Sequence, residues 1–539
     1  MRPEAGATGK FLRPLPSLLI EGSVELFGEN AFPLHLLSLL LHGLVGFTVF
    51  RIFHRITGLR SVPLIAALVF LGCEDHSMGV GWIATITDLL CVAFINLAVL
   101  FHLDFRAGRG RLALGASLGC MLLAFASKES AALAPATVVI LEFVLPDELP
   151  AAPRCDHVRS LRGIFAPGFR RYRRWLPAAA ITVAYLFAYQ AAGFGVSTLM
   201  YLNPMSEPVA YLENLGLGLP AMLLAAVTNV PPSLAAFMPH LLLPMAVAGL
   251  VMLGLLVWGL RPVWREPGVL LASAMFVIAL LPQLATFVSE RLLYFPMVFG
   301  SYVVARLIAE AWPLARRIWP DRTQRAPLVT RLWAWSLALG TVLPGIVLSA
   351  SMPWSYAAQL DQPKRELGPA ATLIEQDDPE AVFVLNTSGM FMTLYAGETL
   401  QYLLGRPLPI YPLSSANAVM QIQRISDRSF VLQADRKGWL SNMFAKLARS
   451  RPELQTGREY KERDFTATLL ELTPDRQDVL RVRFDFNAPL ADSGKLLLTW
   501  DGHRFNAFDY GSLADGETRE LADTSDVLAM LTGSSAEGS

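Results

Sequence analysis

Charged residues are scarce in this chain of 539 residues. Asp, Glu, Lys and Arg make up 17% of it, whereas 53% of the residues are hydrophobic. That hydrophobic share exceeds what ordinary soluble domains contain. The formal net charge is zero, so the chain lacks the basic surplus that nucleic-acid binding requires. The composition therefore argues against a soluble protein and a nucleic-acid-binding protein, and indicates that membrane lipids cover much of the apolar surface.

Cysteines are few, and secretion signals and repeats are missing. The four cysteines lie in the apolar part of the chain, at Cys73, Cys91, Cys120 and Cys155. The polar C-terminal part has none, which excludes a disulfide framework there. The first 32 residues show no sustained apolar run ahead of a small-residue cleavage site, as a cleavable signal peptide requires. No internal repeat is visible.

Apolar blocks bounded by charge fill the first part of the chain. Each block is near the length of about 20 residues that crosses the hydrocarbon core as a helix. The predicted fold is therefore a polytopic α-helical membrane protein. We expect about ten transmembrane helices, near residues 33–51, 61–73, 83–103, 111–127, 130–146, 175–194, 239–260, 268–288, 292–311 and 332–351.

Arginine marks the loops that we expect on the cytoplasmic side. By the positive-inside rule, five connections belong there, namely 51–60, 106–111, 154–174, 261–265 and 316–331. The alternate loops are poor in arginine, as a series of ten spans requires. These loops and everything after Ser351 are therefore expected outside the cytoplasm, in a multi-pass protein of the inner (plasma) membrane.

Two segments do not fit a simple series of spans. Leu217–Val230 is apolar but short, so we expect a re-entrant or interfacial helix there. Ten spans also place the N-terminus outside with nothing to carry it across, so we expect a further helix upstream. Residues 1–32 then belong to an outer loop with an interfacial helix at Pro16–Phe27. The apolar side of that helix would consist of Leu19, Ile20, Val24 and Phe27.

From about residue 352 the composition becomes that of a soluble domain. Ala381–Leu385 is predicted as a buried strand that ends at Asn386, followed by a helix at Met390–Leu404 and a strand at Leu408–Tyr411. Further strands are expected at 429–433, 465–472, 479–486 and 495–500. We predict a mixed α/β domain over 352–514, after a transmembrane domain over 33–351 and before a disordered tail over 515–539.

Four polar clusters fall at the outer ends of the predicted helices. They are Arg13-Pro14-Leu15; Glu74-Asp75-His76 with Asp88; Ser127-Lys128-Glu129; and Ser289-Glu290-Arg291 with Tyr294. Ionisable side chains are costly in hydrocarbon, so such clusters are candidate sites by default. The fixed cations Arg13, Lys128 and Arg291 suit an anionic ligand such as a phosphate. Glu74 and Asp75 supply carboxylates that can act as a base.

Other interpretations of these clusters stay open. Lys128 and Arg291 also fit helix ends that are anchored by snorkelling and paired with their sequence neighbours. Glu74-Asp75-His76 is a candidate ligand set for a divalent cation. The residues alone do not decide between a binding site and structural anchoring.

Histidines and aromatic residues elsewhere are weaker candidates. His35 and His42 lie seven residues apart on one predicted helix, and so roughly on one face. Two histidines without a third ligand more often pack or form hydrogen bonds than bind a metal. Trp82, Tyr201 and Tyr211 lie at predicted membrane interfaces, where an aromatic belt explains them without a function.

The order of these motifs resembles that of a known family, the class C (GT-C) glycosyltransferases that use polyprenyl-phosphate sugars. The resemblance is to the protein O-mannosyltransferase-like and transmembrane-TPR branches, and it covers Arg13 to Pro135, with a further match at Glu290 to Pro296. The matching features are Arg13-Pro14-Leu15, Phe27-Gly28, His35 and His42 around a leucine run, His76 with Val80, Trp82, Ile83 and Asp88, Ser127-Lys128-Glu129 with Pro135, and Glu290-Arg291-Leu292-Leu293-Tyr294-Phe295-Pro296.

The resemblance implies inverting transfer of a sugar from a polyprenyl-phosphate donor to a lipid, glycan or protein acceptor at the extracytoplasmic face. A carboxylate would deprotonate the acceptor hydroxyl while cations stabilise the departing phosphate. On this reading Arg291 and Lys128 contact the phosphate, and Glu74 or Asp75 substitutes for the base. The other residues assigned to substrate binding are Arg13, His76, Asp88, Glu129, Glu290 and Tyr294. No cofactor is implied with certainty, and a divalent cation stays open.

The chain also departs from the family pattern. Ser38, Met78 and Ile86 stand where members often carry asparagine, glutamate and arginine. The acidic pair that supplies the base in such enzymes lies upstream of Arg-Pro-Leu, where this chain has only Glu4. One alternative is therefore a catalytically inactive relative that acts as a scaffold or lipid-glycan binding partner. A transporter of lipid-linked substrates is a third, but charges gathered at one face disfavour it.

Overall fold

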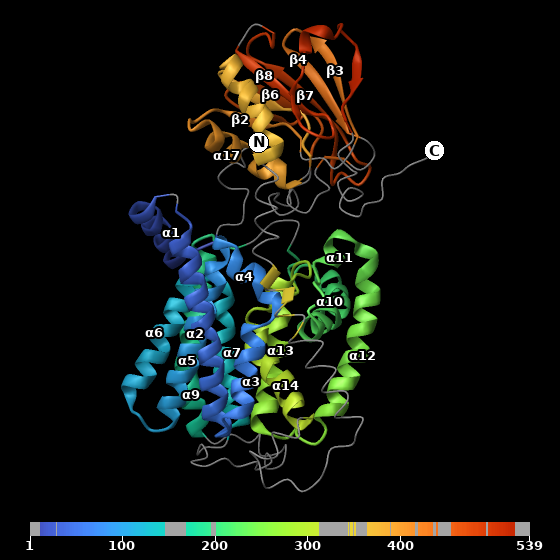
Figure 1. Cartoon of the computed structure of the whole chain (residues 1–539). Helices are drawn as coiled ribbons and strands as arrows, with labels where there is room; N and C mark the ends of the chain where they lie inside the picture. Colours follow the sequence, from blue (N-terminus) through green and yellow to red (C-terminus); the bar gives the residue numbers. More distant parts are fainter. Residues whose placement is uncertain are drawn as a thin grey trace. The chain divides into compact units, whose positions relative to one another are not determined.

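The computed structural model describes residues 11–28, 30–145, 169–195, 201–311, 343, 345, 347–348, 350–351, 364–388, 390–414, 419–434, 438–439, 454–491 and 494–522. The described residues form two compact units, with the division after Pro353. The first unit is helical, and the second combines helices with two β-sheets (Figure 1).

Long apolar helices make up the first unit. Short connections between them, many with Gly or Pro, end one helix and start the next, because neither residue continues a helix well. The longer helices are α1 (Pro14–Phe27), α2 (Phe32–Thr57), α3 (Ser61–Leu71), α5 (Ile86–Arg106), α6 (Arg111–Ser127), α7 (Leu133–Val144), α9 (Phe169–Ala191), α10 (Pro208–Thr228), α12 (Leu242–Leu260), α13 (Pro267–Gln283) and α14 (Pro296–Ala311).

Four helical segments among the described residues are long and apolar enough to cross a membrane. They are Phe32–Thr57, Ile83–Arg106, Pro208–Thr228 and Pro239–Leu260. A fifth results if α3 and the bent segment Glu74–Gly81 after it count as one span. The apolar helices α6, α13 and α14 are shorter. The chain is thus a multi-pass membrane protein, but the expected number of about ten spans is not confirmed.

The predicted helix positions agree well with the observed ones. Each of the first nine predicted helices overlaps a helix of the structure, because a continuous apolar run that must cross lipid can satisfy its backbone only as a helix. The tenth, 332–351, falls mostly outside the described residues. The interfacial helix expected at Pro16–Phe27 is α1. Of its predicted apolar side, Leu19 and Ile20 pack against the protein, whereas Val24 and Phe27 are exposed.

The length of one predicted helix in this unit needs correction. Leu217–Val230 was expected to be a short re-entrant or interfacial helix, but residues 217–228 are the second half of a longer helix, α10, which begins at Pro208. Pro220 lies inside this helix without ending it, and Asn229 closes it in the left-handed conformation (φ 55°). The whole helix has the length and hydropathy of a span.

Buried ion pairs join the helices at their arginine-rich ends. Arg306 of α14 donates through Nε and Nη2 to the two oxygens of Glu266, at 2.8 and 2.9 Å, just before α13 begins. Glu142 of α7 accepts from Arg106, and from His102 Nε2 at 2.8 Å, both on α5. Removing one member of such a pair would leave an uncompensated buried charge, so these arginines have a structural role beyond marking loops.

The second unit contains two sheets. The four-stranded sheet has the order β2-β1-β8-β9, in which β1 (Ala381–Val384) pairs in parallel with both β2 (Ile410–Pro412) and β8 (Lys495–Trp500), and β9 (Phe505–Ala507) is antiparallel. The six-stranded antiparallel sheet has the order β10-β3-β4-β7-β6-β5. Its strands are β3 (Met420–Ser426), β4 (Ser429–Ala434), β5 (Glu459–Lys461), β6 (Phe465–Leu472), β7 (Val479–Phe486) and β10 (Thr518–Glu520).

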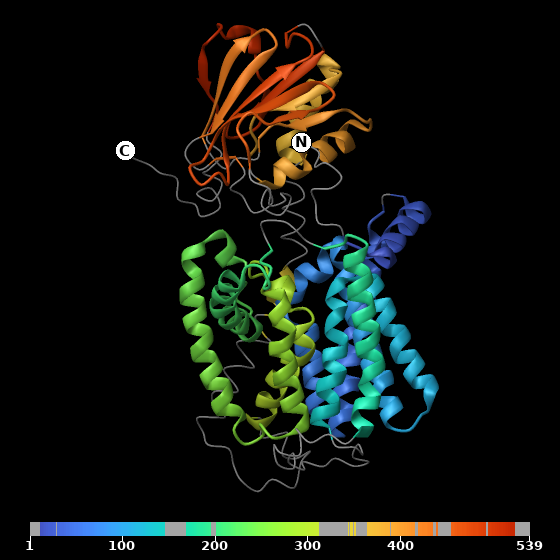
Figure 2. The ribbon, with the colours of Figure 1, turned by 180° about the vertical axis from the view of Figure 1, so that it is seen from behind.

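Strand β1 is buried on both faces, which explains its uninterrupted apolar sequence. Phe383 contributes to the core shared with the six-stranded sheet, where it meets Phe486 edge to face with ring centroids 4.9 Å apart. Val382 and Val384 point to the other side, toward helix 364–377 and α17 (Met390–Leu404). Figure 1 and Figure 2 show the helices of this unit on one side of its strands.

The predicted strand, helix and strand at the start of this unit are confirmed by β1, α17 and β2. The boundary of the tail needs correction. Residues 515–522 are part of the fold, because β10 pairs with β3, Thr518 lying opposite Gln423. Polar composition suggested disorder there, but a short edge strand needs few apolar residues. The rest of the predicted tail lies outside the described residues.

Gly249 provides a test of the packing between α10 and α12. A Cβ atom at Gly249 would overlap the carbonyl oxygen of Pro220, whereas one at Gly254 on the same helix would meet nothing within 4 Å. We expect Gly249→Ala to lower the unfolding free energy by about 1–3 kcal/mol. Gly254→Ala should keep or raise it, because alanine favours helices. Equal melting temperatures of the two purified variants would contradict this packing.

Candidate functional site

Three connections in the helical unit share one backbone pattern. After α3, α6 and α13, an extended residue leads into a 3-10 turn that begins with glutamate. A carboxylate is favourable there, because the first N–H groups of a helical turn carry partial positive charge. The turns are η1 (Glu74–His76), η3 (Glu129–Ala132) and η5 (Glu290–Leu293), and the extended residues are Cys73, Lys128 and Ser289.

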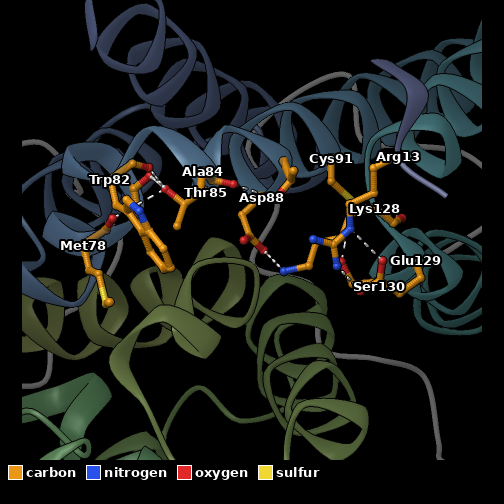
Figure 3. A network of polar contacts seen from close by, with 12 residues as sticks. Arg13, Met78, Trp82, Ala84, Thr85, Asp88, Cys91, Lys128, Glu129 and Ser130 are labelled. Atoms are coloured by element: carbon orange, nitrogen blue, oxygen red, sulfur yellow. Dashed lines mark hydrogen bonds and ion pairs between the residues drawn. The ribbon is translucent and has the colours of Figure 1, made fainter. Parts of the chain in front are cut away.

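Two ion pairs hold the neighbourhood of η3 (Figure 3). Arg13, which precedes α1, forms two hydrogen bonds with Glu129: Nη2 lies 2.7 Å from Oε1 and Nε 3.1 Å from Oε2. Lys128 Nζ lies 2.5 Å from Oδ1 of Asp88, in the first turn of α5. Both pairs are partly buried. The structure thus brings together four predicted site residues, but as partners that neutralise one another.

Arg291 differs from the other two cations. Its guanidinium lies 5.9 Å from the ring centroid of Trp82, within range of a cation–π interaction. Among the described residues no carboxylate forms an ion pair with it. Glu290, beside it on η5, accepts a hydrogen bond from the backbone N–H of Ser233 through Oε2, at 3.3 Å. Arg291 is therefore a cation whose charge the described part of the chain leaves available.

Tyr201 lies where these charges meet. Burial raises the pKa of its phenol, and the charges of Arg291, Glu129, Arg13 and Asp88 all act on that group. The loop that carries it is held to the segment before η5, because the N–H of Leu202 donates to the carbonyl of Ala285 at 2.7 Å. We predicted only an interface aromatic here. No motif marks Tyr201, since its neighbours come from distant parts of the chain.

The residues of η1 are far more enclosed than expected. Glu74 is 2% exposed, Asp75 0% and His76 1%. The side chain of Asn229, at the end of α10, holds the turn in place, because its Oδ1 accepts from the N–H of Glu74 at 3.1 Å. Glu74 Oε2, Asp75 Oδ1 and His76 Nε2 are buried without a hydrogen-bond partner among the described atoms. Such groups are uncommon and point to a functional role.

Aromatic side chains pack against His76 of η1. Tyr294 lies with its ring centroid 4.7 Å from that of His76, and its hydroxyl is 3.1 Å from Nδ1 of His42. His76 uses Nδ1 to bind the carbonyl of Phe70 at 2.8 Å, which leaves Nε2 as the acceptor in the neutral ring. His42 thus pairs with Tyr294, and among the described residues it forms no hydrogen bond or ring contact with His35.

The positions of these side chains do not support a binding site for a divalent cation. Among the described residues, no group of three or more His, Cys, Asp or Glu side chains is placed to hold a metal ion. Glu74, Asp75 and His76 follow one another along the chain, but consecutive residues of a tight turn point in different directions. The metal interpretation of this motif therefore stays a hypothesis without structural support.

A double-mutant cycle tests the contact of Arg13 with Glu129. We expect the double variant Arg13→Ala, Glu129→Ala to lose less unfolding free energy than the sum of the losses in the two single variants. The difference, the coupling energy of the pair, should be about 1 kcal/mol, because the paired side chains are partly shielded from water. Chemical unfolding of the purified chain measures it. Arg109→Ala, which removes a 60% exposed partner of Asp104, is the control and should have almost no effect. Purely additive effects at Arg13 and Glu129 would show that the pair is not formed.

One comparison with known proteins is informative. Residues 12–152 match the family model of dolichyl-phosphate-mannose-protein mannosyltransferases. This segment contains Arg13, η1 and η3, whereas η5 with Arg291 lies outside it. The match does not single out a branch of the family, and no curated protein and no solved structure matches the chain. Over residues 12–152 the chain is therefore similar to a family of membrane glycosyltransferases of the GT-C type.

Proposed function

We propose that the chain is a membrane glycosyltransferase that transfers a sugar from a polyprenyl-phosphate donor to an acceptor, with inversion, at the extracytoplasmic face of the membrane. The family match supports the reaction class, and the apolar helices support a lipid-linked donor. The observation that carries the proposal is Arg291, a cation without a carboxylate partner among the described residues, beside the carboxylate of Glu290. A phosphate leaving group needs such a cation.

The cations would have different roles in phosphate binding. Arg291 would bind the phosphate oxygens of the donor directly, as a guanidinium does well with two parallel N–H groups. Lys128 is held by Asp88 at 2.5 Å, so it would contribute to phosphate binding only when the phosphate competes for its ammonium group. Arg13 is bound through two hydrogen bonds to Glu129 and would fix α1 beside the site.

The proposed catalytic base differs from the one expected from the sequence. Glu74 and Asp75 were the expected carboxylates, but they are enclosed, so either could act only if η1 opens. Glu290 is half-buried, and among the described residues one backbone hydrogen bond reaches it, from the N–H of Ser233 to Oε2. We propose that Glu290 takes the proton of the acceptor hydroxyl while the oxygen of that hydroxyl attacks the anomeric carbon of the sugar. The bond from that carbon to the phosphate oxygen breaks, and Arg291 stabilises the departing polyprenyl phosphate.

The second unit would bind or orient the acceptor. It is a folded domain with its own core, in which the six-stranded sheet packs on the four-stranded one. A separate folded domain attached to a membrane unit is well suited to selecting an acceptor. On this proposal it lies on the same, extracytoplasmic side as η1, η3 and η5.

Arg291→Ala tests the phosphate assignment. We expect transfer of labelled mannose from polyprenyl-phosphate mannose by membranes containing the full chain to fall by about 100-fold or more, because the leaving phosphate loses its cation. Arg265→Ala is a matched control, since its guanidinium also lies over an indole, 5.1 Å from the ring centroid of Trp264, in the connection between α12 and α13. Undiminished transfer by Arg291→Ala would refute the assignment.

A second candidate, a catalytically inactive relative that binds lipid-linked sugar, is favoured by one observation. Asp88 and Glu129 are paired, and Glu74 and Asp75 are buried, which leaves Glu290 as the accessible carboxylate among the predicted site residues. This candidate requires that the purified chain bind polyprenyl-phosphate mannose without turnover. Loss of turnover but not of binding in Glu290→Gln would favour the enzyme instead.

A further inference from the structure

We infer that Trp82 is the surface on which the sugar ring of the donor stacks, beside the phosphate bound by Arg291. This inference rests on the proposed function and deepens it, because it adds a residue for recognition of the sugar.

The backbone holds Trp82 out of the helical path. Its φ and ψ of −94° and 112° are extended, between the short helix α4 (Ser77–Gly81) and the 3-10 turn η2 (Ile83–Thr85). The hydroxyl of Thr85 donates to the carbonyls of Trp82 and Gly79, which fixes this break in the helix. The indole, 39% exposed, is therefore presented at the end of α5 by a structured segment.

A polar and charged surrounding distinguishes this indole from a side chain that only meets lipid. The guanidinium of Arg291 lies 5.9 Å from its ring centroid, which is farther than two stacked groups in contact, so the face of the indole is not sealed by it. Figure 3 shows Trp82 and Asp88 projecting to the same side of the ribbon, with Lys128 reaching Asp88. The indole thus has a cation near its ring that no carboxylate pairs with among the described residues, and the ion pair of Asp88 and Lys128 lies on the same side of the ribbon in Figure 3.

This combination matches a sugar phosphate. In the donor the sugar is bonded directly to the phosphate, so a phosphate on Arg291 brings the ring within reach of Trp82. The C–H groups on one face of a pyranose form an apolar surface that packs on an aromatic ring. Its hydroxyl groups, at the ring edge, can donate to the carboxylate of Asp88 and accept from the ammonium of Lys128. Trp82 is the residue whose ring lies under the guanidinium of Arg291.

An interface anchor is the competing explanation, since exposed tryptophans gather at membrane surfaces. The two explanations differ in what the indole recognises. An anchor contacts membrane lipid and cannot distinguish a lipid phosphate with a sugar from one without. A stacking surface contributes to binding only when the sugar is present. The ratio of two affinities therefore decides between them.

The test compares polyprenyl-phosphate mannose with the same polyprenyl phosphate lacking the sugar, each titrated into the purified full chain in detergent. We expect the native chain to bind the mannose lipid about tenfold more tightly, and Trp82→Leu to bring that ratio close to one by weakening binding of the mannose lipid alone. Arg291→Ala should weaken binding of both lipids. Trp264→Leu, which removes an exposed tryptophan beside Arg265, is the control and should leave the ratio unchanged.

The outcomes separate the inference from the proposed function. An unchanged ratio in Trp82→Leu, or an equal loss for both lipids, overturns the stacking role while leaving phosphate binding by Arg291 in place. A native chain that does not prefer the mannose lipid also overturns it. If the native chain binds neither lipid, the proposed function fails and the inference with it. Melting temperatures of the variants show whether each one is folded when its binding is measured.

Discussion

Within hydrocarbon, a polypeptide must satisfy its own backbone hydrogen bonds, and this constraint decides where the site of this protein can be. Helices meet the requirement over the apolar stretches. Among the described residues, irregular backbone lies in the connections between helices, and the polar side chains of the candidate site lie in or beside these connections, whereas charged groups within helices, such as Arg306 and Glu142, are paired. The turns η1, η3 and η5, each beginning with glutamate, are the clearest result. The proposed chemistry uses the positions that the membrane leaves to polar groups.

Neutralisation of charge is the second theme of the helical unit. At the arginine-rich ends, Glu142 and Glu266 are buried with basic partners and join neighbouring helices. Around η3 the same kind of pairing recurs in a more exposed setting, between Arg13 and Glu129 and between Lys128 and Asp88. Against this background Arg291 stands out, because the described residues give its charge an aromatic neighbour and no carboxylate.

The sequence predicted the helices well, because an apolar run that is longer than a strand and bounded by charge satisfies its backbone hydrogen bonds in lipid as a helix. The sequence also predicted polar residues at the helix ends, and the structure brings two pairs of them into contact, Arg13 with Glu129 and Lys128 with Asp88. The pairing of Arg13 with Glu129 could not be derived, since 116 residues separate them and either could have paired with a sequence neighbour. The hydrogen bond from the N–H of Glu74 to Asn229, the residue that ends α10, could not be derived either, because Asn229 belongs to no motif. The short strands β5 and β10 were not predicted for a similar reason. Pairing with β6 and β3, and not their own composition, makes them strands.

The direction of the helices that follow the three turns has an electrostatic consequence of its own. Helices α5, α7 and α14 all begin beside a predicted site residue or turn, at Ile86, Leu133 and Pro296. The peptide dipoles of each helix leave partial positive charge at its first turn. Each of these helix starts also has a carboxylate in it or shortly before it, namely Asp88 for α5, Glu129 for α7 and Glu290 for α14, and the partial positive charge stabilises that carboxylate. A phosphate bound at one of these starts would therefore compete with the carboxylate for the same backbone charge.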